Sequence, residues 1–403
     1  MNAPRSSLSR PRIPRTVWAL GFVSLFMDLS SELIHALLPI FLVSTMGMSV
    51  VALGALEGAA EATTMIVKVF SGPLSDWLGK RKGLLLVGYG LAALTKPLFP
   101  LATTPFVVAV ARLVDRLGKG IRGAPRDALV ADVAPPDIRG ACFGLRQSMD
   151  TVGAVAGPLL AMALMFAFDD RIRTVLWFAV APAFICVGLL FFGVEEPELP
   201  AGVRTFRSPL EWRAVREFSG RYWFVVVVGA AFTLARFSEA FLVLRAQQAG
   251  FDLAWVPAVM AVMSMTYALS AYPVGKLSDR LDRRVLLAAG LALLMGADLT
   301  LGHAASAPFV FAGVALWGLH MGFTQGIFAA MVADASPAAL RGTAFGIFNL
   351  VSGASMLLSS ILAGWLWERY GAPATFWASA ALAAAPLAMC AFAPAAHAGE
   401  PRG

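Results

Sequence analysis

A cluster of charged side chains interrupts a largely apolar sequence at residues 111–127, ARLVDRLGKGIRGAPRD. Guanidinium and ammonium groups bind carboxylates and other anions, and a carboxylate shielded from water can take up and release a proton. On a helix, which turns about 100° per residue, all of these charges fall within about 140° of one face. The cluster is suited to bind an anionic solute or to carry protons, provided that a helix presents it to a water-filled space. Its charged residues are Arg112, Asp115, Arg116, Lys119, Arg122, Arg126 and Asp127.

The composition places this cluster in a membrane protein. Of the 403 residues, 58% are hydrophobic and 14% are charged, whereas a soluble globular protein has about 25% charged residues. Apolar runs of about 20 residues recur along the chain, which is the length of a helix that crosses a bilayer. We expect an all-α membrane protein, because only helices and closed barrels satisfy their backbone in lipid. The twelve predicted transmembrane helices are 16–46, 50–72, 83–102, 106–134, 141–168, 172–194, 221–245, 255–275, 285–304, 308–334, 342–367 and 373–394.

The distribution of positive charge predicts the orientation of these spans. With the N-terminus inside, cytoplasmic segments hold 19 Lys and Arg residues and external loops hold 4, as the positive-inside rule requires. The net charge of +7 is then a matter of topology and does not indicate nucleic-acid binding. We expect a multi-pass protein of the cell inner (plasma) membrane with both termini cytoplasmic. The predicted segments are a basic N-terminus (1–15), a six-helix bundle (16–194), a cytoplasmic linker (195–220), a second six-helix bundle (221–394) and a cytoplasmic tail (395–403).

The two predicted halves are similar in sequence. ADVAPPDIRGACFG at 131–144 matches ADASPAALRGTAFG at 333–346, and GPLSDWLGKRK at 72–82 matches GKLSDRLDRRV at 275–285. Such repeats are typical of transporters that bind substrate near the membrane midplane, between the two halves. The stretch 308–334 corresponds to residues 106–132 and has no charge before Asp334, so it can only be a span. By symmetry, the charged cluster lies at the same depth in the membrane.

Three stretches resemble motifs of the major facilitator superfamily. GPLSDWLGKRKG (72–83) resembles the family's loop motif between the second and third helices. Arg116 with Gly120 resembles the arginine motif of the fourth helix, and GAVAGP (153–158) resembles the start of a fifth-helix motif typical of exporters. The resemblance implies a monomeric secondary transporter of two six-helix bundles that alternate access, with Arg116 tied to proton coupling. The loop-motif positions are filled by Gly72, Leu74, Asp76, Gly79, Lys80 and Arg81.

The loop motif also implies a gate on the cytoplasmic side. In the family, this loop contacts helix ends of the other half. Asp76 would suit the start of the eleventh helix near Arg341, because helix N-termini favour negative charge. The gate candidates are Asp76, Lys80, Arg81, Arg139, Asp279 and Arg341.

Carboxylates on the first two spans are the expected partners of the positive cluster. Asp28, Glu32 and His35 share one face of the first helix, and Glu57 and Glu61 share one face of the second. These charges either neutralise each other as structural ion pairs or work in transport, and a protein with no ionic task has a less costly apolar alternative. The proton-coupling candidates are Asp28, Glu32, Asp115 and Arg116. The substrate-binding candidates of this half are His35, Glu57, Glu61, Arg112, Arg116, Lys119 and Arg122.

The second half is expected to line the same cavity with fewer charges. Arg236 and Glu239 are three residues apart on the seventh span, where pairing with each other is as plausible as a functional role. His320, Gln325 and Asn349 are further substrate-binding candidates. His320 is either a proton relay or a donor to a backbone carbonyl.

The predicted function is proton-coupled export of a small organic solute. The net charge of +3 on the cluster favours an anionic or zwitterionic metabolite, chelator or drug. The alternative is an importer of an organic anion that works by proton symport or anion exchange. A membrane enzyme or sensor is a remote alternative, because the sequence has no nucleotide-binding loop, catalytic arrangement or metal-ligand cluster that we can identify. The expected partners are the solute, protons and the lipid bilayer, with no nucleic acid and no cofactor.

Overall fold

The computed structural model describes residues 12–196, 214–278, 280–304, 306–337 and 340–392, and within these ranges all regular structure is helical. The helices of the first half are α1 (Arg15–Ile40), η1 (Phe41–Thr45), α2 (Val50–Leu78), α3 (Arg81–Thr95), α4 (Leu98–Leu101), α5 (Pro105–Val133), η2 (Pro136–Ile138), α6 (Arg139–Ala167), α7 (Ile172–Trp177) and α8 (Val180–Gly193). Those of the second half are η3 (Ala214–Glu217), α9 (Gly220–Ala235), α10 (Ala240–Gln248), η4 (Leu253–Trp255), α11 (Pro257–Ser278), α12 (Arg283–His303), α13 (Ala307–Ala335), α14 (Arg341–Tyr370) and α15 (Ala372–Phe392).

The chain is an all-α membrane protein, as predicted. Eleven stretches of the described residues are long and apolar enough to cross a bilayer. The twelfth span is α5, which is long enough to cross a bilayer but carries more charged residues than the other eleven stretches allow. It has 29 residues, as does α13, and both of its ends lie 202 residues before those of α13. The predicted correspondence between the charged stretch and an apolar span is therefore confirmed.

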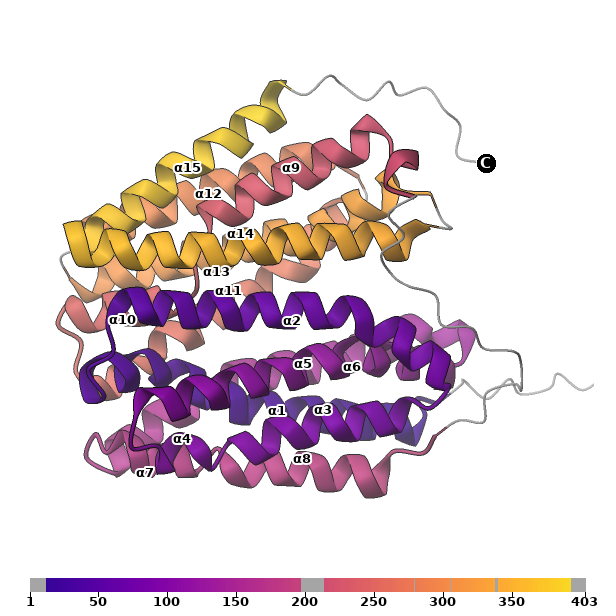
Figure 1. Cartoon of the computed structure of the whole chain (residues 1–403), viewed down its shortest axis with the longest axis horizontal. Helices are drawn as coiled ribbons and strands as arrows, with labels where there is room; N and C mark the ends of the chain where they lie inside the picture. Colours follow the sequence, from indigo (N-terminus) through magenta and orange to yellow (C-terminus); the bar gives the residue numbers. More distant parts are fainter. Residues whose placement is uncertain (1–11, 197–213, 279, 305, 338–339, 393–403) are drawn as a thin grey trace, which may run out of the picture.

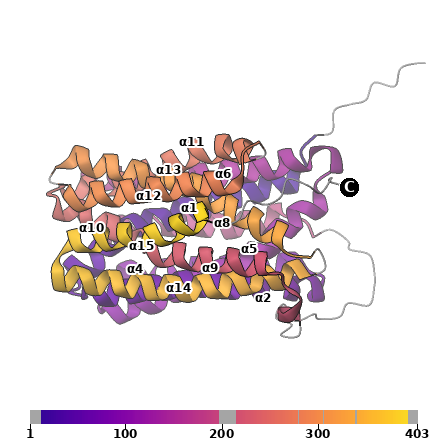
Figure 2. The same cartoon turned by 90° about the horizontal axis from the view of Figure 1, so that it is seen from above.

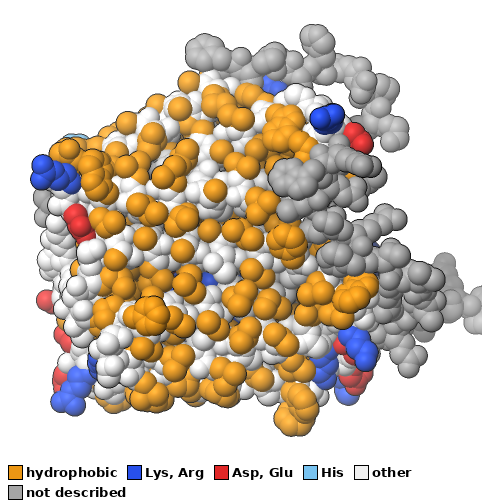
Figure 3. Space-filling model, in the orientation of Figure 1, with side chains coloured by type: hydrophobic (Ala, Val, Ile, Leu, Met, Phe, Trp, Pro, Cys, Tyr) orange, Lys and Arg blue, Asp and Glu red, His pale blue; other side chains and the backbone are white. Residues whose placement is uncertain are grey.

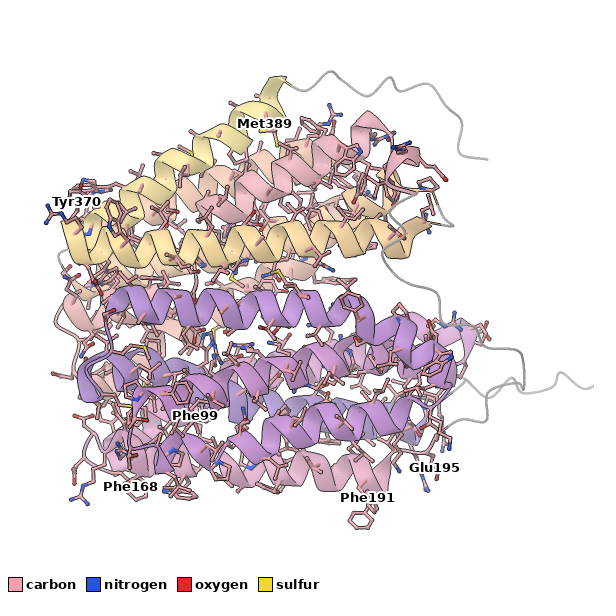
Figure 4. All side chains as sticks on the ribbon, viewed as in Figure 1. Phe99, Phe168, Phe191, Glu195, Tyr370 and Met389 are labelled. Carbon is pink, nitrogen blue, oxygen red and sulfur yellow. The ribbon has the colours of Figure 1, made fainter. Side chains whose placement is uncertain are left out.

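The helices pack as two bundles, one for each half of the sequence (Figure 1). In the first, α1 packs on α6 and α8, and α5 packs on α2 and α3; in the second, α13 packs on α11 and α12, and α15 packs on α9 and α12. The space-filling view shows a broad belt of apolar and uncharged surface, with most charged side chains gathered at the two ends (Figure 3). Phe168 and Tyr370 lie at one end and Glu195 at the other (Figure 4). This distribution is the one that a lipid-embedded bundle requires.

The two bundles touch mainly along two helix pairs on opposite sides, α2 with α14 and α6 with α11 (Figure 2). At the end that holds Phe168 and Tyr370 the contact is closed. There the backbone N–H of Val51 donates to Glu368 Oε1 (2.9 Å), and Gln247 Nε2 donates to Ser44 Oγ (2.9 Å). Toward the other end, α2 and α14 diverge (Figure 1). The space between the bundles is therefore closed at one end.

The second helix is longer than the sequence predicted. The predicted span ends at residue 72, but α2 continues to Leu78, so that most of the loop motif is helical. The loop itself is Gly79 and Lys80. Gly79 ends the helix with a φ of +60°, a left-handed conformation that glycine adopts without strain.

Three spans predicted as continuous are broken, and one of them is the predicted span 172–194, which consists of α7 and α8 with Phe178 and Ala179 between them. α3 and α4 are separated at Lys96 and Pro97, where proline has no N–H to continue the helix. α9 and α10 are separated at residues 236–239, and no proline or glycine lies there. The carbonyls freed by the break between α9 and α10 are satisfied by hydroxyl groups of neighbouring helices, among them Ser359 Oγ on α14, which donates to the carbonyl of Leu234 (2.9 Å). A tertiary partner therefore stabilises this break, and a local sequence signal does not predict it.

Candidate functional site

A cavity of about 530 Å³ lies between the two bundles, and both halves line it. Its position agrees with the predicted site between the halves. The first half contributes mostly charged and polar side chains: Asp28, Glu32, His35, Glu61, Arg116, Lys119, Gln147 and Asp150. The second half contributes aromatic and methionine side chains and an equal number of polar ones, which include four predicted residues: Arg236, Glu239, Gln325 and Asn349.

Helix α1 presents its acidic residues to the cavity because α6 packs unusually close behind it. A Cβ atom at Gly153 would lie 2.5 Å from the carbonyl oxygen of Leu25, and one at Gly157 would lie 2.9 Å from Glu32 Cβ. Any side chain at these two positions would push α1 away from α6. The glycines of the exporter-like motif thus determine the depth at which Asp28 and Glu32 enter the cavity.

Two residues of the charged cluster reach the cavity, Arg116 and Lys119. Arg116 Nη2 lies 3.3 Å from Glu61 Oε1, and its backbone carbonyl accepts a hydrogen bond from Thr64 Oγ1 (3.2 Å). Gly120, the second residue of the arginine motif, allows α5 to approach α2, since a Cβ atom there would lie 2.7 Å from Val67 Cβ. The motif therefore holds Arg116 against α2 at the edge of the cavity.

The other predicted charges of α5 are buried in ion pairs or ring contacts outside the cavity lining. Arg112 binds Glu57 through two contacts, Nε to Oε1 at 3.0 Å and Nη2 to Oε2 at 2.7 Å, and both side chains are about 1% exposed. Asp115 accepts from Lys96 Nζ at 2.9 Å. The Arg122 guanidinium stacks over an aromatic ring, that of Tyr89, 4.6 Å from its centroid. Glu57, Arg112, Asp115 and Arg122, all predicted as site residues, are thus placed inside the first bundle.

Sequence reasoning missed Lys96 and Asp150. Lys96 is the one charged residue of the predicted span 83–102, and Asp150 lies four residues after Arg146 in the predicted span 141–168. Ionisable residues within a span indicate functional or paired groups. Lys96 also donates to Ser31 Oγ (3.0 Å), so it joins α1 to α5. Asp150 on α6 lines the same cavity as Asp28 on α1. Arg126 Nη1 approaches Asp150 Oδ1 at 3.4 Å from behind the cavity wall.

On α1, His35 contacts Glu32 of the same helix and approaches Glu57 of α2. His35 Nδ1 lies 3.3 Å from Glu32 Oε2, and His35 Nε2 lies 3.9 Å from Glu57 Oε2. His35 therefore lies between a carboxylate that lines the cavity and one that is buried. Through His35, Glu32 in the cavity is connected to the buried pair of Glu57 and Arg112.

In the second half, the broken span places a charged pair at the cavity. Arg236 Nη2 contacts Glu239 Oε1 at 2.7 Å, and both residues line the cavity from the non-helical segment between α9 and α10. Ser379 Oγ lies 2.5 Å from the carbonyl of Ala235 and 2.5 Å from Asp298 Oδ2. Helices α12 and α15 thus support the end of α9 through polar contacts.

His320 is buried behind the cavity wall and does not line it. Its Nδ1 lies 3.2 Å from the carbonyl of Gly290. This contact matches the alternative in which the histidine donates to a backbone carbonyl. Gln325 and Asn349, by contrast, line the cavity.

The described gate candidates lie at the end where the bundles diverge, and the ion pairs of Asp76 and Arg81 stay within the first half. Arg81 joins α2, α3 and α5, because Nη1 donates to Asp76 Oδ1 (2.9 Å) and Nε donates to Asp132 Oδ2 (2.6 Å). Among the described residues, no ion pair joins Asp76 to Arg341, and the Asp76 side chain is 70% exposed. Lys80, Arg139 and Arg341 are exposed at the same end. Asp279 lies outside the described residues.

Comparisons with known proteins agree with this architecture. The chain matches the family model of the Major Facilitator Superfamily over residues 20–359 and 241–402. An uncharacterized MFS-type transporter of Methanocaldococcus jannaschii is 29% identical over 376 residues, which is 91% of this chain and 92% of the relative. The multidrug resistance protein MdtH of Photorhabdus laumondii is 26% identical over 361 residues, covering 87% of this chain and 86% of that protein.

Solved structures show the same fold. The nucleoside transporter NupG aligns with a TM-score of 0.71 at 17% identity, over 93% of this chain and 98% of NupG. The human organic anion transporter MFSD10 aligns with a TM-score of 0.64 at 20% identity, over 94% of this chain and all of that one.

Proposed function

Because this chain belongs to the major facilitator superfamily, we propose that it is a secondary active exporter that uses a proton gradient to move a small organic solute out of the cell. The family consists of transporters and not enzymes, so the remote enzyme alternative is set aside. The observation that carries the proposal is the cavity between the bundles, into which Asp28, Glu32 and Asp150 project from the first half. The similarity to multidrug resistance protein MdtH supports the direction of transport.

The shape of the molecule supports alternating access. One end of the cavity is closed by contacts between the bundles, such as the edge-to-face pair of Phe166 and Trp255 with ring centroids 5.4 Å apart. The other end holds the basic residues that the positive-inside rule assigns to the cytoplasm. With that orientation, the described conformation is open to the cytoplasm and ready to take up a solute for export.

Proton coupling is proposed at Asp28 and Glu32, with Asp150 as a third carboxyl group. Carboxylates that share one cavity repel each other when all are ionised, so that one of them takes up a proton more readily than an isolated carboxylate does. The charged groups that face Asp28 are Asp150 on α6, Lys119 on α5 and Glu32 on its own helix. A bound solute that approaches this group competes with the proton for the same carboxylates. Such competition is the means by which proton entry can release the solute on the other side of the membrane.

The proposal is tested in proteoliposomes with a trapped pH-sensitive dye and three fluorescent probes: ethidium (a cation), rhodamine B (a zwitterion) and fluorescein (an anion). At least one probe is expected to be moved by an imposed pH gradient. Asp28→Asn and Glu32→Gln should each abolish gradient-driven accumulation while probe exchange persists. Asp137→Asn, at an exposed position, is the matched control. Unchanged proton movement in both cavity variants would exclude these residues from coupling, and accumulation in the reverse direction would favour the importer.

A further inference from the structure

We propose that the solute is a zwitterion with an aromatic or bulky apolar body, whose cationic group binds Asp28 and whose anionic group binds Lys119. This inference rests on the proposed function for the identity of the cavity as the transport site. It goes further in naming the chemical class of the solute and the residue that binds each of its charges.

Most charged side chains of the cavity already have partners. Most of the charged residues that line it have an opposite charge or a histidine within 4.0 Å: Glu32 contacts His35, and ion pairs join Glu61 with Arg116, Asp150 with Arg126 and Arg146, and Glu239 with Arg236. Asp28 and Lys119 are the two cavity-lining charges with no ion pair within 4.0 Å among the described residues. One carboxylate and one ammonium group therefore remain for a ligand.

Asp28 and Lys119 come from different helices and share one cavity. Asp28 lies on α1 and Lys119 on α5, and both are half-buried. They are near enough to influence each other electrostatically, yet they do not form an ion pair. Separated opposite charges that share one water-filled space are complementary to a molecule that carries both signs. A purely anionic solute would meet Asp28, and a purely cationic one would meet Lys119, so either would leave one group poorly paired.

The wall opposite these charges offers a surface for an aromatic or apolar group. The second half faces these charges with aromatic and sulfur-containing side chains: Phe232, Phe237, Tyr267, Met321, Phe328 and Phe348. Such side chains bind flat apolar groups by stacking and by dispersion contacts. The cavity volume of about 530 Å³ is within the range of small-molecule sites. A molecule with charges at one end and an aromatic body at the other fits this division.

The experiment uses one fluorescent scaffold in three charge forms. The zwitterion is 3-(2-naphthyl)alanine, the cation is its amide and the anion is its N-acetyl derivative. Equilibrium binding is measured on the purified full-length protein in nanodiscs, for wild type, Asp28→Asn and Lys119→Gln. Asp137→Asn and Lys276→Gln are the matched controls, because both side chains are exposed and remote from the cavity lining. Thermal unfolding of each variant checks that it is folded.

A crossed pattern is expected. Wild type should bind the zwitterion about tenfold or more tightly than either derivative, because each derivative loses one hydrogen bond between charged groups. Asp28→Asn should weaken the zwitterion and the amide by about tenfold but leave the N-acetyl derivative unchanged. Lys119→Gln should weaken the zwitterion and the N-acetyl derivative but leave the amide unchanged.

The inference is overturned if wild type does not bind the zwitterion, or if each variant weakens all three ligands equally. Its failure is distinct from failure of the proposed function. Loss of the crossed pattern with gradient-driven transport retained overturns only the substrate class. A retained crossed pattern in a protein that moves no probe with the pH gradient overturns proton-coupled export.

Discussion

The pair formed by Glu57 and Arg112 allows a sharp test of which charges in the first bundle are structural. Both side chains are about 1% exposed and make two contacts, at 3.0 and 2.7 Å. Removing one partner of such a pair leaves an uncompensated buried charge and costs about 3–5 kcal/mol, whereas replacing both with apolar residues is often neutral or stabilising. We therefore expect Glu57→Leu and Arg112→Met each to destabilise the protein strongly, and the double variant to recover most of the loss.

The two single variants should differ in a defined direction. An isolated arginine cannot lose its proton in a protein, whereas an isolated carboxylate can be neutralised by taking one up. His35 Nε2 also lies 3.9 Å from Glu57 Oε2 and offers a partial replacement partner when Arg112 is removed. Glu57→Leu should therefore be the more destabilising of the two.

Equilibrium unfolding by denaturant in mild detergent, followed by tryptophan fluorescence, measures these differences. A cycle over the two singles and the double gives the coupling free energy, expected at about 3 kcal/mol or more. The control is the pair Arg283 and Asp334, whose side chains are 30% and 50% exposed, so that Arg283→Met should cost less than about 1 kcal/mol. The reasoning is refuted if the singles at the buried pair cost as little as the control. It is also refuted if the double variant is stable but no longer binds the solute.

Three further changes test the remaining steps of the argument. Gly58→Val should push α2 away from α14, because a Cβ atom there would lie 2.9 Å from the α14 backbone; spin-label distances between the two helices should lengthen at the closed end. Gly157→Val should displace α1 at Glu32 at a cost of about 1–3 kcal/mol and reduce gradient-driven transport, whereas Gly144→Val on the same helix faces open space and should transport normally. Arg81→Gln should lower the turnover rate without changing solute affinity, because Arg81 joins helix ends remote from the cavity; equal loss of affinity would contradict that role.

The sequence predicted the number and order of the spans because apolar length is a local property of the chain. It also predicted the helical nature of the charged stretch, because the apolar copy 202 residues later removed the ambiguity of composition. It did not predict the break between α9 and α10, because that break depends on hydroxyl groups that other helices supply. Ser359 is 123 residues from Arg236, and no local pattern connects them.

The division of the charged face into cavity and core was likewise beyond the sequence. A face of about 140° on one helix is wide enough to meet several neighbours at once. Helix α5 packs on both α2 and α3, so that Arg112 and Arg122 meet different helices while Lys119 meets the cavity. Helical periodicity gives the direction of each side chain, but the neighbours decide whether that direction leads to a partner or to water.

The placement of the ion pairs also explains how so many membrane charges are compatible with movement. Every ion pair among the described residues joins two partners in the same half, including Arg112 with Glu57 and Lys96 with Asp115. The described contacts between halves are of another kind, namely close helix packing and a few neutral or singly charged hydrogen bonds such as Val51 with Glu368. Breaking a buried ion pair costs several kcal/mol, whereas an exposed hydrogen bond exchanges with water at little net cost. If the halves rock as rigid bodies, the costly pairs move intact and only the weak contacts are exchanged. Rocking of this kind therefore requires only that no ion pair join the two bundles, and the described ion pairs meet that condition.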